Sequence, residues 1–479
     1  MIEGWIRRTF PTLQSIYDRA PYPLQNLLTT MRGCVLARIR YQKRFWEHLD
    51  ELVRRERYSP GEMEAYQEAQ LRELVAYGYE NVPFYRNAFL TANLSPDDIR
   101  TVDDLKKLPV LSRETVRANW QSLVSRAVPK EERIHVFTSG TTGAGLSVIW
   151  EKQALVLNWA FRARQRRWAK VNPREWRLTF LGSRVVPATR ERPPFWRTNW
   201  FEKQVFMSIF HLSETHMPSY VAFLKGHEGW PMEGFPSVLS ILSDFMLKER
   251  ECIPMKAIFT DGEPLYPDVR AKIESAFSSK VYDTYGMTEW AGLIQGCERG
   301  NFHLISDFGI LEILDEGGNP VPPGREGDFV WTGFVNRGMP LLRYRIGDRG
   351  IWQEDQRCAC GRPFPLVHPT VTREGDCVTA PDGRILSPRT ISPLVRRKSF
   401  RVCQFVQEST DSLTVRIVPG NGRAEKDAED VRRALRAVVG DSIQLSVQWA
   451  ERPIQHLNGK IPIVISNLGK GNEREVPHR

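Results

Sequence analysis

The chain has 479 residues, 41% of them hydrophobic and 26% charged, and a formal net charge of +10. This composition is typical of a globular protein with two to four domains or subdomains. No stretch approaches the roughly 18 apolar residues of a membrane span, and the N-terminus lacks an apolar signal core. Seven scattered cysteines do not resemble a disulfide framework. We therefore expect a cytoplasmic protein without a transmembrane segment.

The first predicted region, residues 1–80, is helical and amphipathic. Aromatic, Leu and Ile positions alternate with Arg and Glu, and prolines interrupt the pattern at positions 11, 21, 23 and 60. We expect this region to cover the main body.

A loop dense in hydroxyls and glycines follows, between predicted strands at 134–137 and 146–150. Free backbone N–H groups and hydroxyls in such a loop can bind phosphate oxygens, and glycine lets the backbone approach them. No Gly-Lys-Ser/Thr follows, so this is not a Walker loop. A plain flexible loop is the alternative. The candidate phosphate-binding residues are Thr138, Ser139, Gly140, Thr141, Thr142 and Gly143.

Positive charge is concentrated in residues 162–203, which hold twelve Arg or Lys against three acids. Such a segment could receive a phosphorylated cofactor, an anionic saccharide, a membrane surface or nucleic acid. The alternative is a solvated arginine-rich face. Since no nucleic-acid-binding signature accompanies the charge, we expect no nucleic-acid partner. The aromatic residues from Phe195 to Phe210, with His211, are either core or the wall of an acyl pocket.

From about 130 to 350, strand-like and helix-like runs alternate, which favours an α/β body. We predict strands at 176–181, 256–260 and 280–284 and helices at 238–250 and 267–277. Near 312–332 the pattern becomes β-rich, with a turn at 315–319 between two strands.

Three motifs follow predicted strands in this body. They are Thr260-Asp261-Gly262-Glu263, Thr284-Tyr285-Gly286-Met287-Thr288-Glu289 and Arg343-Tyr344-Arg345-Ile346-Gly347-Asp348. The carboxyl ends of strands are where α/β proteins bind ligands. The second motif offers an aromatic face and a metal ligand, and the third a carboxylate for vicinal ribose hydroxyls.

Beyond residue 374 the pattern predicts a separate α+β domain of about a hundred residues. Its predicted elements are strands at 402–407, 413–418 and 444–449 and a helix at 427–439. The predicted organisation is thus 1–80, 81–373 and 374–479.

In this order, the loop and the three motifs resemble the acyl-adenylate-forming superfamily and, within it, the phenylacetate–CoA ligase family. Residues 193–200 and 210–213, with the helical N-terminus, look like its capsular-polysaccharide (CapK-type) branch, in which the substrate is generally unassigned. The resemblance implies an α/β fold. Its large N-terminal adenylate-forming domain has α/β subdomains and a β-rich subdomain, and its small C-terminal α+β domain is mobile.

The resemblance also implies roles for individual residues. The hydroxyl loop would wrap the β- and γ-phosphates, and Asp348 with Arg373 would hold the ribose. Gly262, Glu263, Tyr285 and Gly286 would border the adenine. Thr288 would contact the α-phosphate, Glu289 would hold Mg²⁺, and Lys460 in Leu457-Asn458-Gly459-Lys460 would stabilise charge as a carboxylate attacks.

The implied function is ATP-dependent activation of a small carboxylic acid to an acyl-adenylate, followed by transfer to the thiol of CoA. The implied cofactors are ATP, Mg²⁺ and CoA. Two motifs depart from the family: the loop ends in Gly143-Ala144-Gly145 rather than Gly-x-Pro, and the hinge near 374 reads Thr372-Arg373-Glu374-Gly375-Asp376. Glycine can still rotate there, so we expect a hinge.

Three cysteines and a histidine form a candidate zinc site. Cys358 and Cys360 lie on one tight turn, and Cys297 and His303 on another short segment. Four such ligands satisfy tetrahedral zinc with no open position, so the metal would be structural. The pattern also looks like a zinc knot in some phenylacetate–CoA ligase relatives. The alternative is that Cys297 and His303 are ordinary buried residues.

Two other functions stay open at this point. The acyl group could pass to a carrier-protein thiol or a saccharide, or the chain could be a non-enzymatic scaffold of a surface-polysaccharide pathway. Glu289, Asp348 and Lys460 argue against the scaffold. The sequence leaves peripheral membrane contact and the oligomeric state open.

Overall fold

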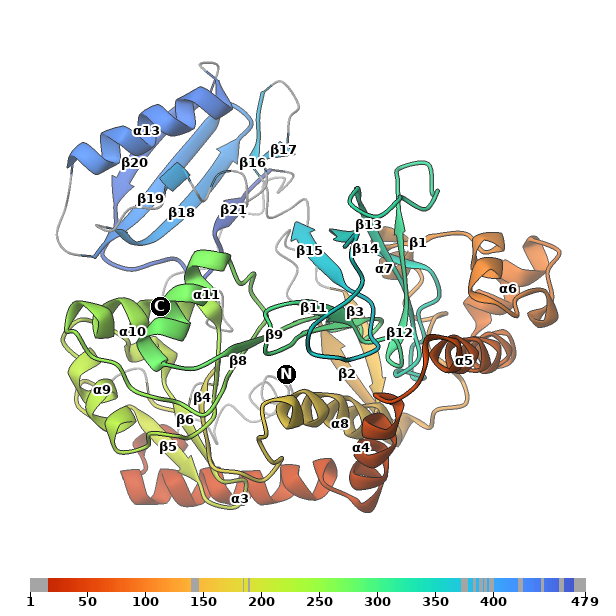
Figure 1. Ribbon diagram of the computed structural model, residues 1–479, viewed down its shortest axis with the longest axis horizontal. Helices are drawn as coiled ribbons and strands as arrows, with labels where there is room; N and C mark the ends of the chain where they lie inside the picture. Colours follow the sequence, from red (N-terminus) through yellow and green to blue (C-terminus); the bar gives the residue numbers. More distant parts are fainter. Residues whose placement is uncertain are drawn as a thin grey trace.

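The computed structural model describes residues 16–138, 146–183, 185–187, 190–371, 378–381, 385–386, 391, 394–395, 400–420, 425–440, 443–455 and 461–468. Figure 1 shows a large body with a smaller domain above one end of it. Within the described residues, no helix has both the length and the apolar character needed to cross a membrane.

Helices dominate the N-terminal region, as predicted. They are α3 (Tyr22–Arg40), α4 (Lys43–Arg55), α5 (Pro60–Asn81), α6 (Pro83–Thr91), η1 (Pro96–Asp98) and η2 (Val102–Lys107). α5 begins at a complete capping box formed by Ser59 and Glu62. α3 runs along the base of the body (Figure 1), where Asn26 accepts a hydrogen bond from the Thr198 N–H (3.0 Å). The boundary near residue 80 stays a prediction.

An eight-stranded sheet, in the order β11-β10-β9-β8-β7-β4-β6-β5, forms the centre of the body. The five strands from β9 to β6 run parallel, so their carboxyl ends meet at one edge of the sheet. The strands are β4 (Arg177–Phe180), β5 (Trp196–Asn199), β6 (Gln204–Met207), β7 (Met232–Gly234), β8 (Ile258–Asp261), β9 (Val281–Gly286), β10 (Leu293–Gly296) and β11 (Phe302–Leu304).

Helices flank this sheet on both faces (Figure 1). They are α8 (Lys152–Trp168), η4 (Ile209–His211), α9 (Met217–Lys225), α10 (Pro236–Lys248) and α11 (Pro267–Phe277). α10 and α11 share a core with the parallel strands, through Leu239, Ile273 and Val281. α8 belongs mainly to a second core, which also contains Phe45 and Leu49 of α4. The predicted helix at 267–277 coincides with α11.

A five-stranded sheet forms the predicted β-rich region. Its path is β1 (Leu111–Ser112), β14 (Tyr344–Trp352), β13 (Glu326–Gly333) and β12 (Gly309–Leu314), with β15 (Val367–Val371) paired to β14. Near β1 lie α7 (Arg113–Ala118), η3 (Lys130–Glu132) and the hairpin of β2 (Arg133–Phe137) with β3 (Ser147–Glu151). The hairpin confirms the two strands predicted around the hydroxyl loop.

The small domain is a four-stranded sheet covered by one described helix. Its strand order is β20 (Gln444–Trp449), β19 (Ser412–Pro419), β18 (Phe400–Ser409) and β21 (Val464–Ser466), with α13 (Glu425–Val439) on one face and the short pair β16 (Val378–Thr379) and β17 (Ile385–Leu386) nearby. Val431 and Leu435 of α13 pack on Phe405 and Val415 in a core of their own. The predicted fold class, a large α/β body with a small α+β domain, is confirmed.

Candidate active site

The carboxyl ends of β8 and β9 carry two of the predicted motifs side by side. Gly262 follows β8 with φ +77°, a left-handed conformation that glycine adopts without strain, and Glu263 comes next. Tyr285 and Gly286 end β9, which is paired in parallel with β8. The structure therefore brings Glu263 and Tyr285 to one edge of the sheet, where a nucleotide base would be bordered on two sides.

Two stacked tryptophans, Trp150 and Trp290, fix the segment that follows β9. Trp150 of β3 stacks on Trp290 (3.8 Å between centroids) and donates a hydrogen bond from Nε1 to the Thr288 carbonyl (2.8 Å). Trp290 has φ +53°, an uncommon value for a residue with a side chain. This fixed turn directs Glu289 into the body, where its side chain is 1% exposed.

The buried Glu289 carboxylate is satisfied on one oxygen only. The Tyr344 hydroxyl donates to Oε1 (3.0 Å), and the Arg113 guanidinium lies 3.7 Å from the same oxygen. Oε2 has no hydrogen-bond partner among the described residues. A buried carboxylate oxygen without a donor is a fitting ligand for a hard divalent cation such as Mg²⁺. The donor set therefore agrees with the expected role of Glu289.

Thr138 lies at the start of the predicted phosphate loop and is 6% exposed. Its hydroxyl oxygen accepts hydrogen bonds from the Leu146 N–H (2.8 Å) and from Arg113 (3.2 Å), and its own N–H donates to the Leu146 carbonyl (2.9 Å). These contacts close the base of the loop next to Glu289. The other predicted loop residues, Ser139, Gly140, Thr141, Thr142 and Gly143, lie outside the described residues.

Asp348 is aimed at Tyr285 by an irregularity in β14. Between Asp328 and Val330 of β13 the pairing shifts, because β14 has extra residues opposite them. One of these residues is Gly347, with φ +91°. A bulge of this kind re-aims the side chain beside it. Asp348, 7% exposed, accepts a hydrogen bond from the Tyr285 hydroxyl (2.6 Å). Tyr285, the candidate for contact with adenine, is thus hydrogen-bonded directly to Asp348, the candidate for contact with the ribose.

Glu263 connects the large body to the small domain. Its Oε2 accepts a hydrogen bond from the Ser237 N–H at the start of α10 (3.0 Å), and its Oε1 accepts one from the Ile461 N–H (3.0 Å). Ile461 directly follows Lys460, which, like Arg373 and Gly375, lies outside the described residues. The Arg401 guanidinium of β18 pairs with Glu214, a second link between the two domains.

The four predicted zinc ligands converge. Their ligand atoms all lie within 4.8 Å of one another. Cys297 and Cys358 sulfurs are 3.8 Å apart, and Cys360 sulfur is 3.4 Å from His303 Nε2. Zn–S bonds of about 2.3 Å in a tetrahedron place two thiolates about 3.8 Å apart, so this spacing fits zinc.

The surroundings of the cluster prepare its ligands. His303 donates from Nδ1 to the Phe364 carbonyl (2.9 Å), which leaves the Nε2 lone pair directed at the cysteines. Burial lowers the pKa of His303, which favours the neutral ring. Burial also raises the pKa of the Cys297 thiol to about 12, and a bound cation would reverse that shift. The six described cysteines form no disulfide.

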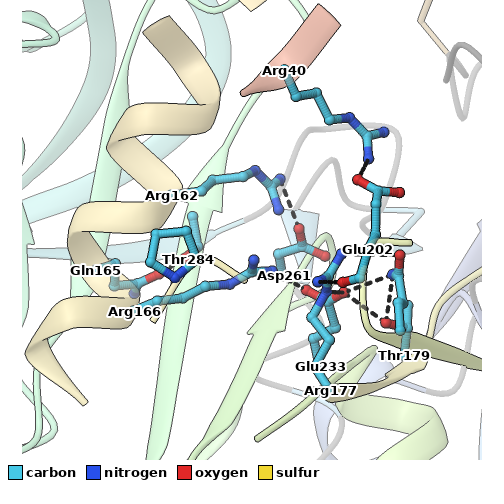
Figure 2. A network of polar contacts seen from close by, with 12 residues as sticks. Arg40, Arg162, Gln165, Arg166, Arg177, Thr179, Glu202, Glu233, Asp261 and Thr284 are labelled. Atoms are coloured by element: carbon cyan, nitrogen blue, oxygen red, sulfur yellow. Dashed lines mark hydrogen bonds and ion pairs between the residues drawn. The ribbon is translucent and has the colours of Figure 1, made fainter. Parts of the chain in front are cut away.

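The interpretation of segment 162–203 as a solvated face is wrong for four of its arginines, whereas Lys170, Arg174, Arg192 and Lys203 are exposed. Arg164, Arg166, Arg177 and Arg197 are at most 7% exposed. Figure 2 shows the network around two of them, in which Arg166 pairs with Glu233. Arg177 donates to the Glu202 carbonyl (2.9 Å) and to Gln204 Oε1 (3.0 Å). The charges face acids and carbonyls that lie far away in sequence, which no local pattern reveals.

The aromatic residues of 195–210 do not wall one pocket. Phe195 is fully buried and stacks on His211 (5.2 Å) and Tyr220 (5.7 Å), while Trp200 and Phe201 are 52% and 39% exposed. The Nδ1 atom of His211 shares a hydrogen bond with the Ser208 hydroxyl (2.7 Å) in the same turn. Phe195 and His211 therefore belong to the core, and Trp200 and Phe201 to the surface.

Three residues of the site were not identified from the sequence: Arg113, Trp150 and Tyr344. Arg113 reaches Glu289 because β1 pairs in parallel with β14, which also carries Tyr344. The motif around Tyr344 was visible, but its contact with Glu289 depends on pairing between distant strands.

The fold and this arrangement resemble those of acyl-adenylate-forming enzymes. No family model matches the chain. The chain is 24% identical over 462 residues to Protein CapK of Staphylococcus aureus, a match that covers 95% of this chain and 100% of CapK. It is 27% identical over 338 residues to the phenylacetate–coenzyme A ligase of Thermus thermophilus, covering 66% of this chain and 71% of that protein.

Among solved structures, a 2-hydroxyisobutyryl-CoA ligase in its postadenylation state matches with a TM-score of 0.66 at 20% identity, covering 87% of this chain and 92% of that one. This likeness shows the fold. The chain is thus similar in sequence to CapK and to phenylacetate–CoA ligases, and it shares its fold with an acid–CoA ligase.

Proposed function

We propose that this protein activates a carboxylic acid with ATP as an acyl-adenylate and then transfers the acyl group to the thiol of CoA. The observation that carries the proposal is the convergence of Thr138, Glu263, Tyr285, Glu289 and Asp348 at one edge of the parallel sheet, with the residue after Lys460 hydrogen-bonded to Glu263. Phosphate-binding, adenine, ribose and metal-binding groups are the parts that adenylation requires.

In the first half-reaction, a substrate carboxylate oxygen attacks the α-phosphorus of ATP, the bond to the bridging oxygen breaks, and pyrophosphate leaves. Tyr285 and Asp348 would orient the nucleoside, while Thr138 and its loop would hold the leaving group. Glu289, with its Oε1 held by Tyr344, would hold Mg²⁺ through Oε2, and the ion supplies charge neutralisation at the phosphates when bound. Lys460 would stabilise the charge that develops as the carboxylate attacks.

In the second half-reaction, a thiol attacks the carbonyl carbon of the mixed anhydride, loses its proton, and AMP leaves. Rotation of the small domain near Gly375 would replace Lys460 with a thiol channel. Such a rotation requires the Ile461–Glu263 hydrogen bond and the Arg401–Glu214 pair to break. Free thiols throughout the described chain fit a reducing cytoplasm, where ATP and CoA are available.

Two relatives support CoA as the acceptor, because both are named phenylacetate–coenzyme A ligase, from Thermus thermophilus and Escherichia coli. A carrier-protein thiol and a saccharide are the competing acceptors. Thioester formation with CoA, after the adenylate has formed, separates the three.

Carboxylate-dependent ATP–pyrophosphate exchange tests the first half-reaction. We expect exchange with at least one acid of a broad panel, and its loss in Lys460→Ala. Lys280→Ala is the matched control, because Lys280 is 64% exposed and pairs only with Glu274 at the surface. Exchange that persists in Lys460→Ala would remove that residue from the mechanism, and no exchange with any acid would refute adenylation.

We also propose that Cys297, His303, Cys358 and Cys360 hold a structural zinc ion. Its position between β10–β11 and the turn before β15 would fasten the end of α8 to the β-rich sheet, since Arg362 of that turn stacks on Trp168 (4.3 Å). Metal analysis should find one zinc per chain, lost in the double variant Cys358→Ser/Cys360→Ser and retained in the control Cys252→Ser, which changes an exposed cysteine. Unchanged zinc in the double variant would contradict the site.

A further inference from the structure

Helix α3 buries mainly small and polar side chains and exposes large apolar ones, the reverse of the usual arrangement in a surface helix. Its buried residues are Gln25, Asn26, Thr29, Gly33, Leu36 and Ala37. Its exposed apolar residues, here called the α3 stripe, are between 43% and 59% exposed: Leu24, Leu27, Met31 and Val35. They lie at positions i, i+3, i+7 and i+11, so they form one line along the helix.

The orientation of α3 is fixed by specific contacts with β5. Gln25 accepts a hydrogen bond from Arg197 Nε (2.6 Å), and the hydrogen bond to Asn26 described above joins the helix to the same strand. Gly33 lies so close to the Asn199 side chain that a Cβ on residue 33 would come within 2.2 Å of it. A rotation of α3 that buried the stripe would break all of these contacts.

The α3 stripe stays open to solvent in the part of the chain that the structure describes. In Figure 1, α3 forms the lower edge of the body, on the side away from the small domain. A continuous exposed apolar stripe of this kind marks a surface that another apolar phase covers.

The charge along this helix has one sign. Residues 19–46 contain six basic residues and no acid. Arg38 lies three positions after the last residue of the stripe, on the same side of the helix, and Lys43 and Arg44 follow; all three are exposed. A second copy docked through the same stripe would bring an equal basic rim against this one, which like-charge repulsion opposes. Anionic lipid headgroups would complement the rim instead.

Aromatic side chains lie beside the stripe and beyond its end. The Trp200 N–H donates to Thr30 Oγ1 of α3 (3.3 Å), and the exposed ring of Phe201 follows, with the Arg174 guanidinium over it (5.8 Å). Trp46, just after the basic residues, is also exposed. Tryptophan and long basic side chains are typical of the boundary between acyl chains and headgroups.

We propose that α3 docks this protein on an anionic lipid bilayer. The α3 stripe would lie among the outermost acyl chains and the basic residues among the phosphates, with the helix in the plane of the interface rather than across the bilayer. The small domain, on the opposite side of the body in Figure 1, would face away from the lipid.

Co-sedimentation of the full chain with vesicles tests this docking surface. The vesicles are phosphatidylcholine alone, or phosphatidylcholine with about 30% phosphatidylglycerol, at about 0.1 M salt. We expect the anionic vesicles to bind about tenfold more tightly than the neutral ones. Failure of the anionic vesicles to bind, or equal binding of the two kinds, would overturn the proposal.

An apolar pair of substitutions assigns the binding to the stripe. Leu27→Ser/Met31→Ser should weaken binding to the anionic vesicles about tenfold or more, because it removes apolar contact without changing the charge. The matched control is Leu90→Ser/Leu247→Ser, which changes exposed leucines of α6 and α10 and should bind as the wild type does. Since all four side chains are exposed, both variants should melt close to the wild type. Equal binding by the two variants would refute the role of α3.

A charged pair tests the basic rim. Arg38→Glu/Lys43→Glu should also weaken binding to the anionic vesicles about tenfold or more. Arg432→Glu/Arg433→Glu makes the same change of net charge on exposed positions of α13 and should have a much smaller effect. Equal losses in the two variants would show that net charge alone drives binding and would overturn the assignment to α3.

Light scattering of the free protein separates the bilayer from a second copy. The wild type and Leu27→Ser/Met31→Ser should have the same mass in solution. A dimer that dissociates in the double variant would show that a second copy covers the stripe, and the proposal would then be wrong. Cover by residues 1–15, which lie outside the described residues, would leave the full chain unable to bind the anionic vesicles.

Discussion

Asp283 offers a direct test of the electrostatics beneath the candidate site. It lies in β9, is 5% exposed, and accepts a hydrogen bond from the Thr260 hydroxyl (2.5 Å). Burial raises its pKa from 3.8 to about 7, with Asp261 adding to the rise and Thr260 and Arg270 opposing it. The perturbation is Asp283→Asn, which keeps the acceptor for Thr260 and removes the titration.

The size and sign of the effect follow from linkage. A carboxyl whose folded pKa exceeds its unfolded pKa destabilises the fold when it ionises, so wild-type stability falls as the pH rises from about 4 to about 7. Three pKa units correspond to about 4 kcal/mol at pH 8, and the difference vanishes near pH 4. The variant should therefore be the more stable protein at pH 8 and should lose that advantage at low pH.

Thermal melts at pH 5 and pH 8 measure this difference. We expect Asp283→Asn to melt several degrees above the wild type at pH 8, and by a smaller margin at pH 5. Asp244→Asn is the control, because Asp244 is 38% exposed and pairs with Lys272 at the surface (2.8 Å). A melting difference for Asp283→Asn that is the same at both pH values would refute the assignment.

Three further outcomes are expected. Arg164→Ala should cost about 3–5 kcal/mol of stability, because it removes both hydrogen bonds to the fully buried Asp307 and leaves it only the longer contact with Arg55 (3.8 Å). Arg167→Ala should cost at most about 1 kcal/mol in the same denaturation experiment. Tyr285→Phe removes the 2.6 Å hydrogen bond to Asp348 and should raise the KM for ATP about five- to tenfold with little change in melting, and an unchanged KM would contradict the ribose assignment. Gly347→Ala, at φ +91°, should destabilise by about 1–3 kcal/mol, while Gly61→Ala, which meets nothing within 4 Å in the first turn of α5, should be neutral or slightly stabilising in parallel melts.

Local patterns predicted the elements of this chain well. The helix α11 and the strand β20 fall at the expected residues, because each is a short amphipathic or alternating run bounded by polar or proline residues. The convergence of three cysteines and a histidine was also predictable, since these residues lie in two short segments whose residue types are typical of metal sites. The order of motifs along the chain then indicated the family.

Long-range pairing was beyond the sequence. Arg164 pairs with Asp307, Arg166 with Glu233 and Arg113 with Glu289. Each acidic partner lies on a segment whose position depends on how the strands pair. Counted along the chain, these arginines predict only a basic surface.

The arrangement of α8 has a consequence for how this protein can be altered. Arg164 serves the stability of the body, while Arg162, at 39% side-chain exposure, contributes one removable contact, its ion pair with Asp261. Arg166 lies between these extremes, because its acidic partner Glu233 is shared with Arg177. A library of variants can therefore change 162 and 261 with little loss of stability, and 166 only together with 177 and 233.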